Sequence, residues 1–153
     1  MVNKLGQEPT QIIEKGLMGA VFMHQISYVY LGAEKMNVDN ETIEEGQSYT
    51  NMEHHWDEAF GYLFGTVDFP AEGTDRFWGK YANGRNDLLA SNTKLMNAFI
   101  AGRFAITQLD YAARDAQISI IRMELEKVCA ATAIHYLSLA KKEISDDALR
   151  NHA

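Results

Sequence analysis

The stretch YAARDAQISIIRMELEKVCAATAIHYLSLAKK, residues 111–142, decides the fold of this chain. Its apolar residues recur at alternating steps of three and four, which places them on one face of an α-helix. That buried seam consists of Ile118, Ile121, Leu125, Val128, Thr132, His135 and Leu139. The polar residues between them predict a solvent-facing side, which includes Arg114, Arg122, Glu126 and Lys127. The sequence therefore predicts one long helix with a single packed face.

The same periodicity predicts three more long helices upstream, over about residues 10–31, 41–65 and 86–108. Asn40 is the expected N-cap of the second helix, because Glu41, Glu44 and Glu45 would suit its positive end. TVDFPAEGTD (66–75) is expected to be a loop, and RFWGKYANG (76–84) a short helix. We therefore expect an all-α fold, an antiparallel bundle of about four long helices in one domain over residues 1–153.

The apolar positions of these helices are also predicted. The seam of the first helix is Ile13, Leu17, Ala20, His24, Ser27 and Leu31. The second helix is expected to turn Met52, Trp56, Ala59, Phe60 and Leu63 inward, and the third Leu89, Leu95, Met96, Phe99, Ile100 and Phe104. At the end of the chain, Ser145 with Asp146 and Asp147 is typical of a new helix start. We therefore expect the chain to be a fragment of a longer helical protein.

The charge balance argues against nucleic acid as a partner. The 14 Lys and Arg residues are outnumbered by 21 Asp and Glu, for a net charge of −7, which would repel phosphate backbones. No transmembrane segment is expected, since GLMGAVFMHQISYVYLG (16–32) is interrupted by His24, Gln25 and Ser27. The single cysteine, Cys129, lies in the apolar run VCAATAI and is expected to be a buried thiol.

A candidate metal site lies in MEHHWDEAFGYLFG, residues 52–65. Residues three or four apart share a helix face, so both His55 and His54 are able to pair with Glu58. A carboxylate and an imidazole from one helix suit iron, zinc or manganese when a facing helix completes the site. His55 is the favoured ligand, because it borders the apolar face more closely than His54 does.

Two further histidines extend this hypothesis. His24 and His135 lie on the seams of the first and fourth helices, so three helices could each point an imidazole inward. The alternative is that these histidines are buried residues satisfied by ordinary hydrogen bonds. Likewise, the aromatic residues could line a ligand groove, but core packing is the favoured interpretation; they include Tyr28, Tyr30, Trp56, Phe60, Tyr62, Phe64, Phe77, Trp78 and Tyr81.

The run HHWDEAFGYLFG resembles the glycine-x-histidine-x-x-glutamate motif of imelysin-like proteins, with His55 and Glu58 at the matching places and Phe64-Gly65 after them. Glu53 and His54 precede His55, so the glycine of that motif is absent. Nearly the whole chain resembles the Bacteroidota envelope lipoproteins grouped as domain of unknown function 4856. The segments that carry this resemblance are EKGLMGAVF, KMNVDNET, MEHHWDEAFGY, RFWGKY and AATAIHYL.

The imelysin resemblance implies an exported helical protein of the bacterial envelope, periplasmic or lipid-anchored, with its signal removed. It also implies a link to iron uptake and a metal or ligand site near His55 and Glu58. We therefore expect a non-catalytic protein that binds iron or zinc, with His54, His24 and His135 as further candidate ligands. One alternative is a metallopeptidase at the same site. Another is a structural or interaction domain that binds a protein or glycan without metal.

Overall fold

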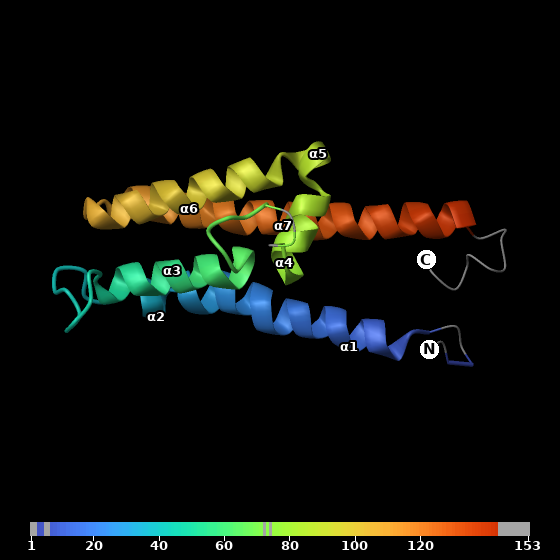
Figure 1. Cartoon of the computed structure of the whole chain (residues 1–153), viewed down its shortest axis with the longest axis horizontal. Coiled ribbons are helices and arrows are strands. Elements are labelled where there is room, and N and C mark those ends of the chain that lie inside the picture. The colour runs from blue at the N-terminus through green and yellow to red at the C-terminus, as the bar shows by residue number, and fades with distance from the viewer. Residues whose placement is uncertain (1–2, 5–6, 72, 74, 144–153) are drawn as a thin grey trace.

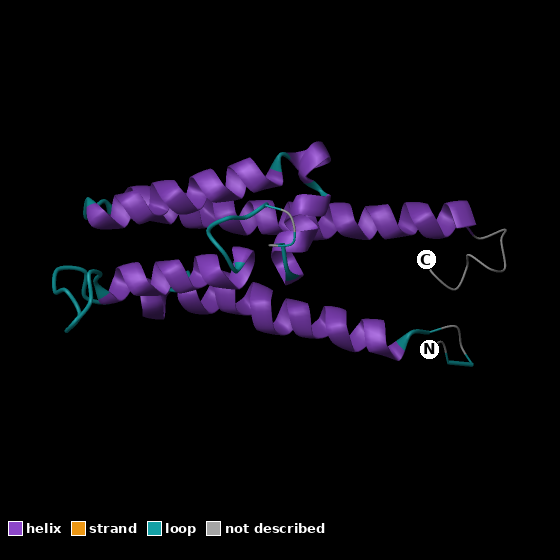
Figure 2. Ribbon diagram, in the orientation of Figure 1, coloured by secondary structure: helices purple, strands orange, loops and turns teal. Residues whose placement is uncertain are grey.

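The structure is a computed structural model that describes residues 3–4, 7–71, 73 and 75–143, and this part of the chain is helical, as predicted. Figure 1 labels the helices. Figure 2 shows that loops connect them, and the described residues form no β-strand element. In chain order they are α1 (Pro9–Leu17), η1 (Met18–Met23), η2 (Gln25–Tyr30), α2 (Ala33–Met36), α3 (Asn51–Phe64), α4 (Phe77–Gly84), α5 (Asn86–Leu89), α6 (Ser91–Thr107) and α7 (Tyr111–Glu143).

Two antiparallel hairpins form the bundle (Figure 1). The first helical run, α1 to η2, packs against α3, and α6 packs against α7. The short α4 contacts α3, α6, α7 and η1, and so joins both hairpins. The beginning of α1 and the end of α7 lie at the same end of the bundle. The expected antiparallel arrangement of long helices is therefore confirmed.

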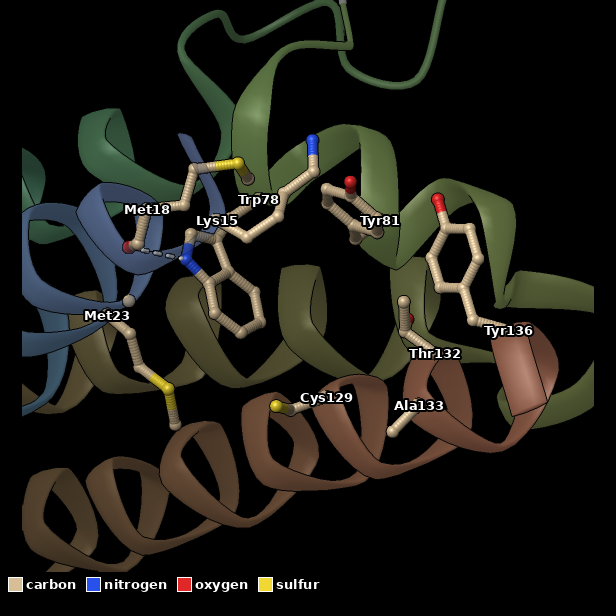
Figure 3. Close-up of a pocket in the computed structure, with 10 residues that line it drawn as sticks. Lys15, Met18, Met23, Trp78, Tyr81, Cys129, Thr132, Ala133 and Tyr136 are labelled. Carbon is tan, nitrogen blue, oxygen red and sulfur yellow. Dashed lines mark hydrogen bonds between the residues drawn. The ribbon is translucent and has the colours of Figure 1, made fainter. Parts of the chain in front are cut away.

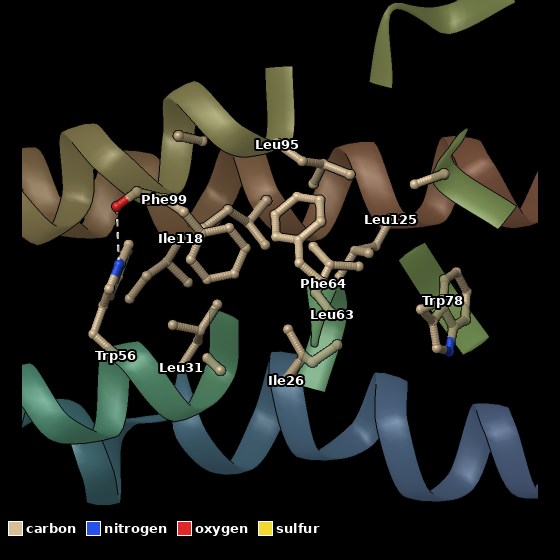
Figure 4. Packing of buried hydrophobic residues seen from close by; sticks show 14 of the residues in the cluster. Ile26, Leu31, Trp56, Leu63, Phe64, Trp78, Leu95, Phe99, Ile118 and Leu125 are labelled. Carbon is tan, nitrogen blue, oxygen red and sulfur yellow. Dashed lines mark hydrogen bonds between the residues drawn. The ribbon is translucent and has the colours of Figure 1, made fainter. Parts of the chain in front are cut away.

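The hydrophobic core fills the space between the hairpins (Figure 4). Trp56 and Phe64 of α3 meet Phe99 of α6 edge to face, with ring centroids 5.7 and 6.0 Å apart. From α7, the predicted residues Ile121 and Leu125 are fully buried. The N–H of the Trp56 indole donates to the backbone carbonyl of Phe99 at 3.0 Å, so this large side chain is buried without an unpaired donor.

The first helix differs from its predicted seam. After α1 it continues as the π-helical turns η1 and η2, in which more residues make up each turn than in an α-helix. A seam drawn with α-helical spacing therefore drifts around the axis. Ser27 and Leu31 are buried as expected, but His24 is exposed. Ile13 and Leu17 are exposed for another reason: they lie in α1, before the π-helical turns, and α1 buries none of its residues.

The second long helix begins ten residues later than predicted, and the N-cap expected at Asn40 is wrong. Thr50 caps α3 in a capping box with Glu53. Asn40 is instead a buried bridge, whose amide donates to the carbonyl of Ile106 at 2.8 Å and whose oxygen accepts from the Thr50 hydroxyl at 2.6 Å. A side chain that holds a loop against α6 cannot also cap the helix that follows it.

The predicted helix over residues 86–108 is divided into α5 and α6 by Ala90, whose φ is +53°. Leu95 and Phe99 of α6 are buried as expected. Ile100 and Phe104 are 60% and 66% exposed, because they lie on another face of α6 from the core residues.

On α7, the first half of the predicted seam is buried, but the expected wet face is partly wrong. Arg114 is 4% exposed and donates to the carbonyl of Met36, and Arg122 donates to the carbonyls of Ser27 and Leu31. Both arginines donate hydrogen bonds to backbone carbonyls in or just after η2 and α2. The periodicity of a single helix cannot reveal such contacts with other helices. Cys129 is exposed rather than buried.

The helix start expected at Ser145 lies outside the described residues. Among the helices that the structure describes, none combines the length and apolar character needed to cross a membrane.

Candidate functional site

The predicted metal-binding residues His54, His55 and Glu58 lie in the first two turns of α3, directly after its capping box. His54 Nε2 lies 3.1 Å from Glu58 Oε1, with both side chains partly exposed. The pairing with Glu58 is thus made by His54, at a spacing of four, rather than by the favoured His55. Tyr49, just before α3, stacks on the His54 imidazole with a centroid distance of 5.1 Å and limits its rotation.

Tyr30, the last residue of η2, brings the first helical run to the same place. Its hydrogen bond with Glu58 is the largest cause that raises the pKa of the Tyr30 hydroxyl, and burial adds to it. Tyr30 therefore stays protonated and donates to the carboxylate. Its ring lies 6.2 Å from His55 and 5.3 Å from Tyr62 between centroids. Tyr30 was expected to be a packing aromatic and not part of this site, because residue spacing within one helix gives no sign of a contact with another helix.

His55 lies deeper and has spare hydrogen-bonding capacity. Its Nδ1 is buried without a hydrogen-bond partner in the part of the chain that the structure describes. Burial is the largest cause that lowers the pKa of His55, and the positive charges of Lys35 and His54 lower it further against the attraction of Glu58. His55 is therefore a neutral imidazole at pH 7, the protonation state that binds metals. We call His54, His55, Glu58 and Tyr30 the α3 cluster.

His24 and His135 lie away from the α3 cluster. His24 is exposed, and its ring stacks on Tyr28 with a centroid distance of 5.7 Å. His135 contacts Tyr136 near the end of α7. Arg122 contacts Leu31, next to Tyr30, and His135 follows it by 13 residues, about 20 Å along a helix at 1.5 Å per residue. Among the described residues, no group of three or more His, Cys, Asp or Glu side chains is arranged to hold a metal ion.

A second candidate site is a groove at the other end of the bundle, between α1, η1, α4 and α7 (Figure 3). It encloses about 310 Å³ and is almost entirely apolar. Its lining residues are Lys15, Met18, Gly19, Met23, Trp78, Tyr81, Cys129, Thr132, Ala133 and Tyr136. Trp78 and Tyr81 belong to the aromatic set for which core packing was favoured. Trp78 is part of the core and Tyr81 packs against it, as expected, and both also line this groove.

The comparisons with known proteins identify a family. The family described as Domain of unknown function (DUF4856) matches residues 1–152. The chain belongs to this family. No curated protein and no solved structure matches the chain. The predicted resemblance to domain of unknown function 4856 is thus confirmed. The candidate site of this DUF4856 domain must be interpreted from its own residues.

Proposed function

We propose that this DUF4856 domain is a non-catalytic binding protein that takes up a divalent metal ion, iron or zinc, at His54, His55 and Glu58. The observation that supports it most is the buried Nδ1 of His55, which has no hydrogen-bond partner among the described residues beside the His54–Glu58 pair. Two imidazoles and a carboxylate within one helical turn provide the mixed nitrogen and oxygen donors that suit iron and zinc.

The proposed site needs local rearrangement, and its residues allow it. His54 and Glu58 are partly exposed, so their contact can open toward a solvated ion. Tyr30 and Tyr49 hold Glu58 and His54 from outside α3, which orients the donors as outer-shell partners do in metal sites. His24 and His135 are not part of this proposal, because they lie at other places in the bundle.

A non-catalytic role is favoured because the α3 cluster supplies few groups for hydrolysis. A zinc peptidase needs about three protein ligands, an open position for water and a separate general base. Here the three donors of the cluster would all be used to hold the ion. The similarity of His55, Glu58 and Phe64-Gly65 to the imelysin motif supports a role in iron acquisition in the bacterial envelope as part of the same proposal.

Metal analysis and titration test the proposal. Untagged protein is analysed for bound metals, and Zn²⁺ and Fe²⁺ are titrated by calorimetry into the wild type and the double variant His55→Ala, Glu58→Gln. We expect one ion per chain and an affinity at least about tenfold lower in the double variant, the usual effect of losing metal ligands. Affinity should also fall with pH, because protons compete for imidazole nitrogen.

The matched control is His24→Ala, which removes an exposed imidazole outside the α3 cluster. It should bind the ion as the wild type does. Absence of binding in the wild type, or equal affinity in the double variant and the wild type, would contradict the proposal.

A second candidate function is an interaction domain for a protein or glycan. It is favoured by apolar side chains that α1 and η1 expose to solvent, with exposed fractions of 63% for Ile12, 61% for Ile13, 55% for Leu17 and 42% for Val21. This function requires no metal, so a wild type that binds neither ion would direct attention to this surface.

A further inference from the structure

We propose that the groove between α1, η1, α4 and α7 binds an amphipathic carboxylate of the fatty-acid class. The acyl chain would lie along the apolar wall and the carboxylate would meet Lys15 beside Tyr81 and Tyr136. This inference does not depend on metal binding, since none of its residues belongs to the α3 cluster.

The apolar wall suits a hydrocarbon chain. Met18 and Met23 line it from η1, opposite Cys129 and Ala133 of α7 (Figure 3). The N–H of the Trp78 indole is already satisfied, because it donates to the carbonyl of Met18 at 3.1 Å, so Trp78 offers the groove an apolar ring. Methionine side chains adapt their shape to flexible ligands. A volume of about 310 Å³ lies at the lower end of the range for small-molecule sites.

The polar tips of the groove lie together on one side of it. Figure 3 shows the Lys15 ammonium and the hydroxyls of Tyr81 and Tyr136 at the same edge, away from the α7 wall. Lys15 Nζ lies 5.5 Å from the centroid of the Tyr81 ring, and a hydrogen bond with Tyr81 is the largest cause that raises the pKa of Lys15. Burial is the largest cause that raises the pKa of Tyr136. At neutral pH this edge therefore presents the Lys15 cation and the protonated Tyr136 hydroxyl, which are donors for a carboxylate.

The charges around this edge favour an anion. Arg85 lies close enough to Tyr136 for its positive charge to act on the Tyr136 hydroxyl, and its Nε is buried with no hydrogen-bond partner among the described residues. Glu14 lies 3.8 Å from Lys15, but both side chains are exposed, so this acid offsets little of the positive charge. The chain as a whole has a net charge of −7, but two cations lie beside this apolar groove. This local positive charge would attract a carboxylate.

The groove also contains an unsatisfied polar atom. Thr132 lines the groove, and its Oγ1 is buried without a hydrogen-bond partner within the described residues. Buried hydroxyls are normally paired, and an unpaired one next to a cavity indicates a missing partner. A water molecule that accompanies the ligand would supply it.

Gly19 allows the groove to be closed without damage to the fold. A Cβ atom added at Gly19 would meet no atom within 4 Å, and Gly19 lines the groove, so a Leu side chain there would occupy the ligand volume. Gly16 in α1 has equally open surroundings but does not line the groove, and Gly16→Leu is the matched control.

The experiment titrates decanoate, below its micelle concentration, into the full chain and measures heat by calorimetry and tryptophan fluorescence, to which Trp78 in the groove and Trp56 in the core both contribute. Saturable binding is expected in the wild type and in Gly16→Leu. In Gly19→Leu the affinity should fall by at least about tenfold, because the side chain fills the groove. No saturable binding in the wild type, or unchanged affinity in Gly19→Leu, would overturn the proposal.

The role of the charged edge is tested with Lys15→Gln and the neutral ligand decanol. Lys15→Gln should weaken decanoate binding by about two- to fivefold, as expected for a half-exposed ion pair, and leave decanol binding unchanged. Decanol that binds the wild type as tightly as decanoate would refute the assignment of a carboxylate. Because the metal titration uses other residues and other ligands, failure here would not affect the metal proposal.

Discussion

Glu53 shows how one side chain serves both its own helix and the contact between hairpins. Its Oε2 accepts from the Thr50 N–H at 3.0 Å, which completes the capping box of α3. Its Oε1 accepts from Arg103 and from the Thr107 hydroxyl, both on α6. Burial, the largest single influence, would raise the pKa of Glu53, but these hydrogen bonds together outweigh it and hold the pKa below its ordinary value.

Glu53→Gln should therefore lower the free energy of unfolding by about 2 kcal/mol at pH 7, because a charge-assisted pair is lost in a buried place. A lowered carboxyl pKa stabilises the fold above the unfolded-state value of 4.5, and this contribution disappears as the pH falls through the folded-state pKa. Urea unfolding of wild type and variant should thus differ most near neutral pH and least in acid.

Asp57→Asn is the control, because Asp57 accepts from the same Arg103 at 3.0 Å. Burial raises the pKa of Asp57 instead, so its ionised form is not favoured by folding. This variant should be as stable as the wild type at pH 7 or slightly more stable. A loss in Asp57→Asn equal to that in Glu53→Gln would show that the capping box is not the source of the effect.

The candidate site could be predicted from the sequence only where its residues lie close together in the chain. The spacing of His54, His55 and Glu58 on one helix was sufficient to predict that they cluster. Tyr30 and the pairing of Asn40 with Ile106 depend on how separate helices pack, which spacing within a helix does not encode. His24 faces solvent because π-helical turns shift the register of the first helix.

At the scale of the elements, Gly102 determines how closely α6 approaches α3. An added Cβ there would lie 2.1 Å from an atom of the Trp56 ring, far inside van der Waals contact. In the same region the Trp56 indole donates to the Phe99 carbonyl of α6. A larger residue at position 102 would force the two helices apart and weaken both contacts.

Gly102→Ala should destabilise the protein by about 1–3 kcal/mol, because the overpacking outweighs the gain in helix propensity. Gly61→Ala, at an exposed position in α3 where a Cβ meets nothing within 4 Å, should stabilise by about 0.5–1 kcal/mol. Thermal and urea unfolding of both variants measure the difference. If both substitutions stabilised the fold, the close approach of α3 and α6 would be refuted.

The elements were predictable to the extent that local signals were undisturbed by packing. The helix over 111–142 was predicted from its first residue, Tyr111, and is helical as far as the described residues extend, because a long periodic seam has no competing interpretation. The start of α3 was misplaced, since Asn40 and Thr50 both have the chemistry of an N-cap and only the contact of Asn40 with Ile106 distinguishes them. Ala90, with its positive φ, gives no sequence signal for the break between α5 and α6.

At the scale of the whole molecule, arginines of α7 connect the two hairpins through backbone carbonyls. Arg122 donates to the carbonyl of Ser27 through Nε at 2.9 Å and Nη2 at 2.7 Å, and to that of Leu31 at 2.9 Å. Arg114 donates to the carbonyl of Met36 at the end of α2. The last carbonyls of a helix lack partners within it, so these side chains satisfy groups that the first hairpin cannot satisfy alone.

Arg122→Met should therefore lower the free energy of unfolding by about 2–3 kcal/mol, since the carbonyls of Ser27 and Leu31 lose a charged donor while much of the packing remains. Arg122→Lys should recover only part of the loss, because one ammonium cannot reproduce the planar, two-pronged donation of a guanidinium.

Lys141→Met, an exposed position on the same helix, is the matched control and should change the free energy of unfolding by less than about 0.5 kcal/mol. Urea unfolding monitored by circular dichroism and by tryptophan fluorescence measures all three, and for a single domain both signals should change in one transition. Equal stability of Arg122→Met and Lys141→Met would show that the hydrogen bonds of Arg122 do not help to hold the hairpins together.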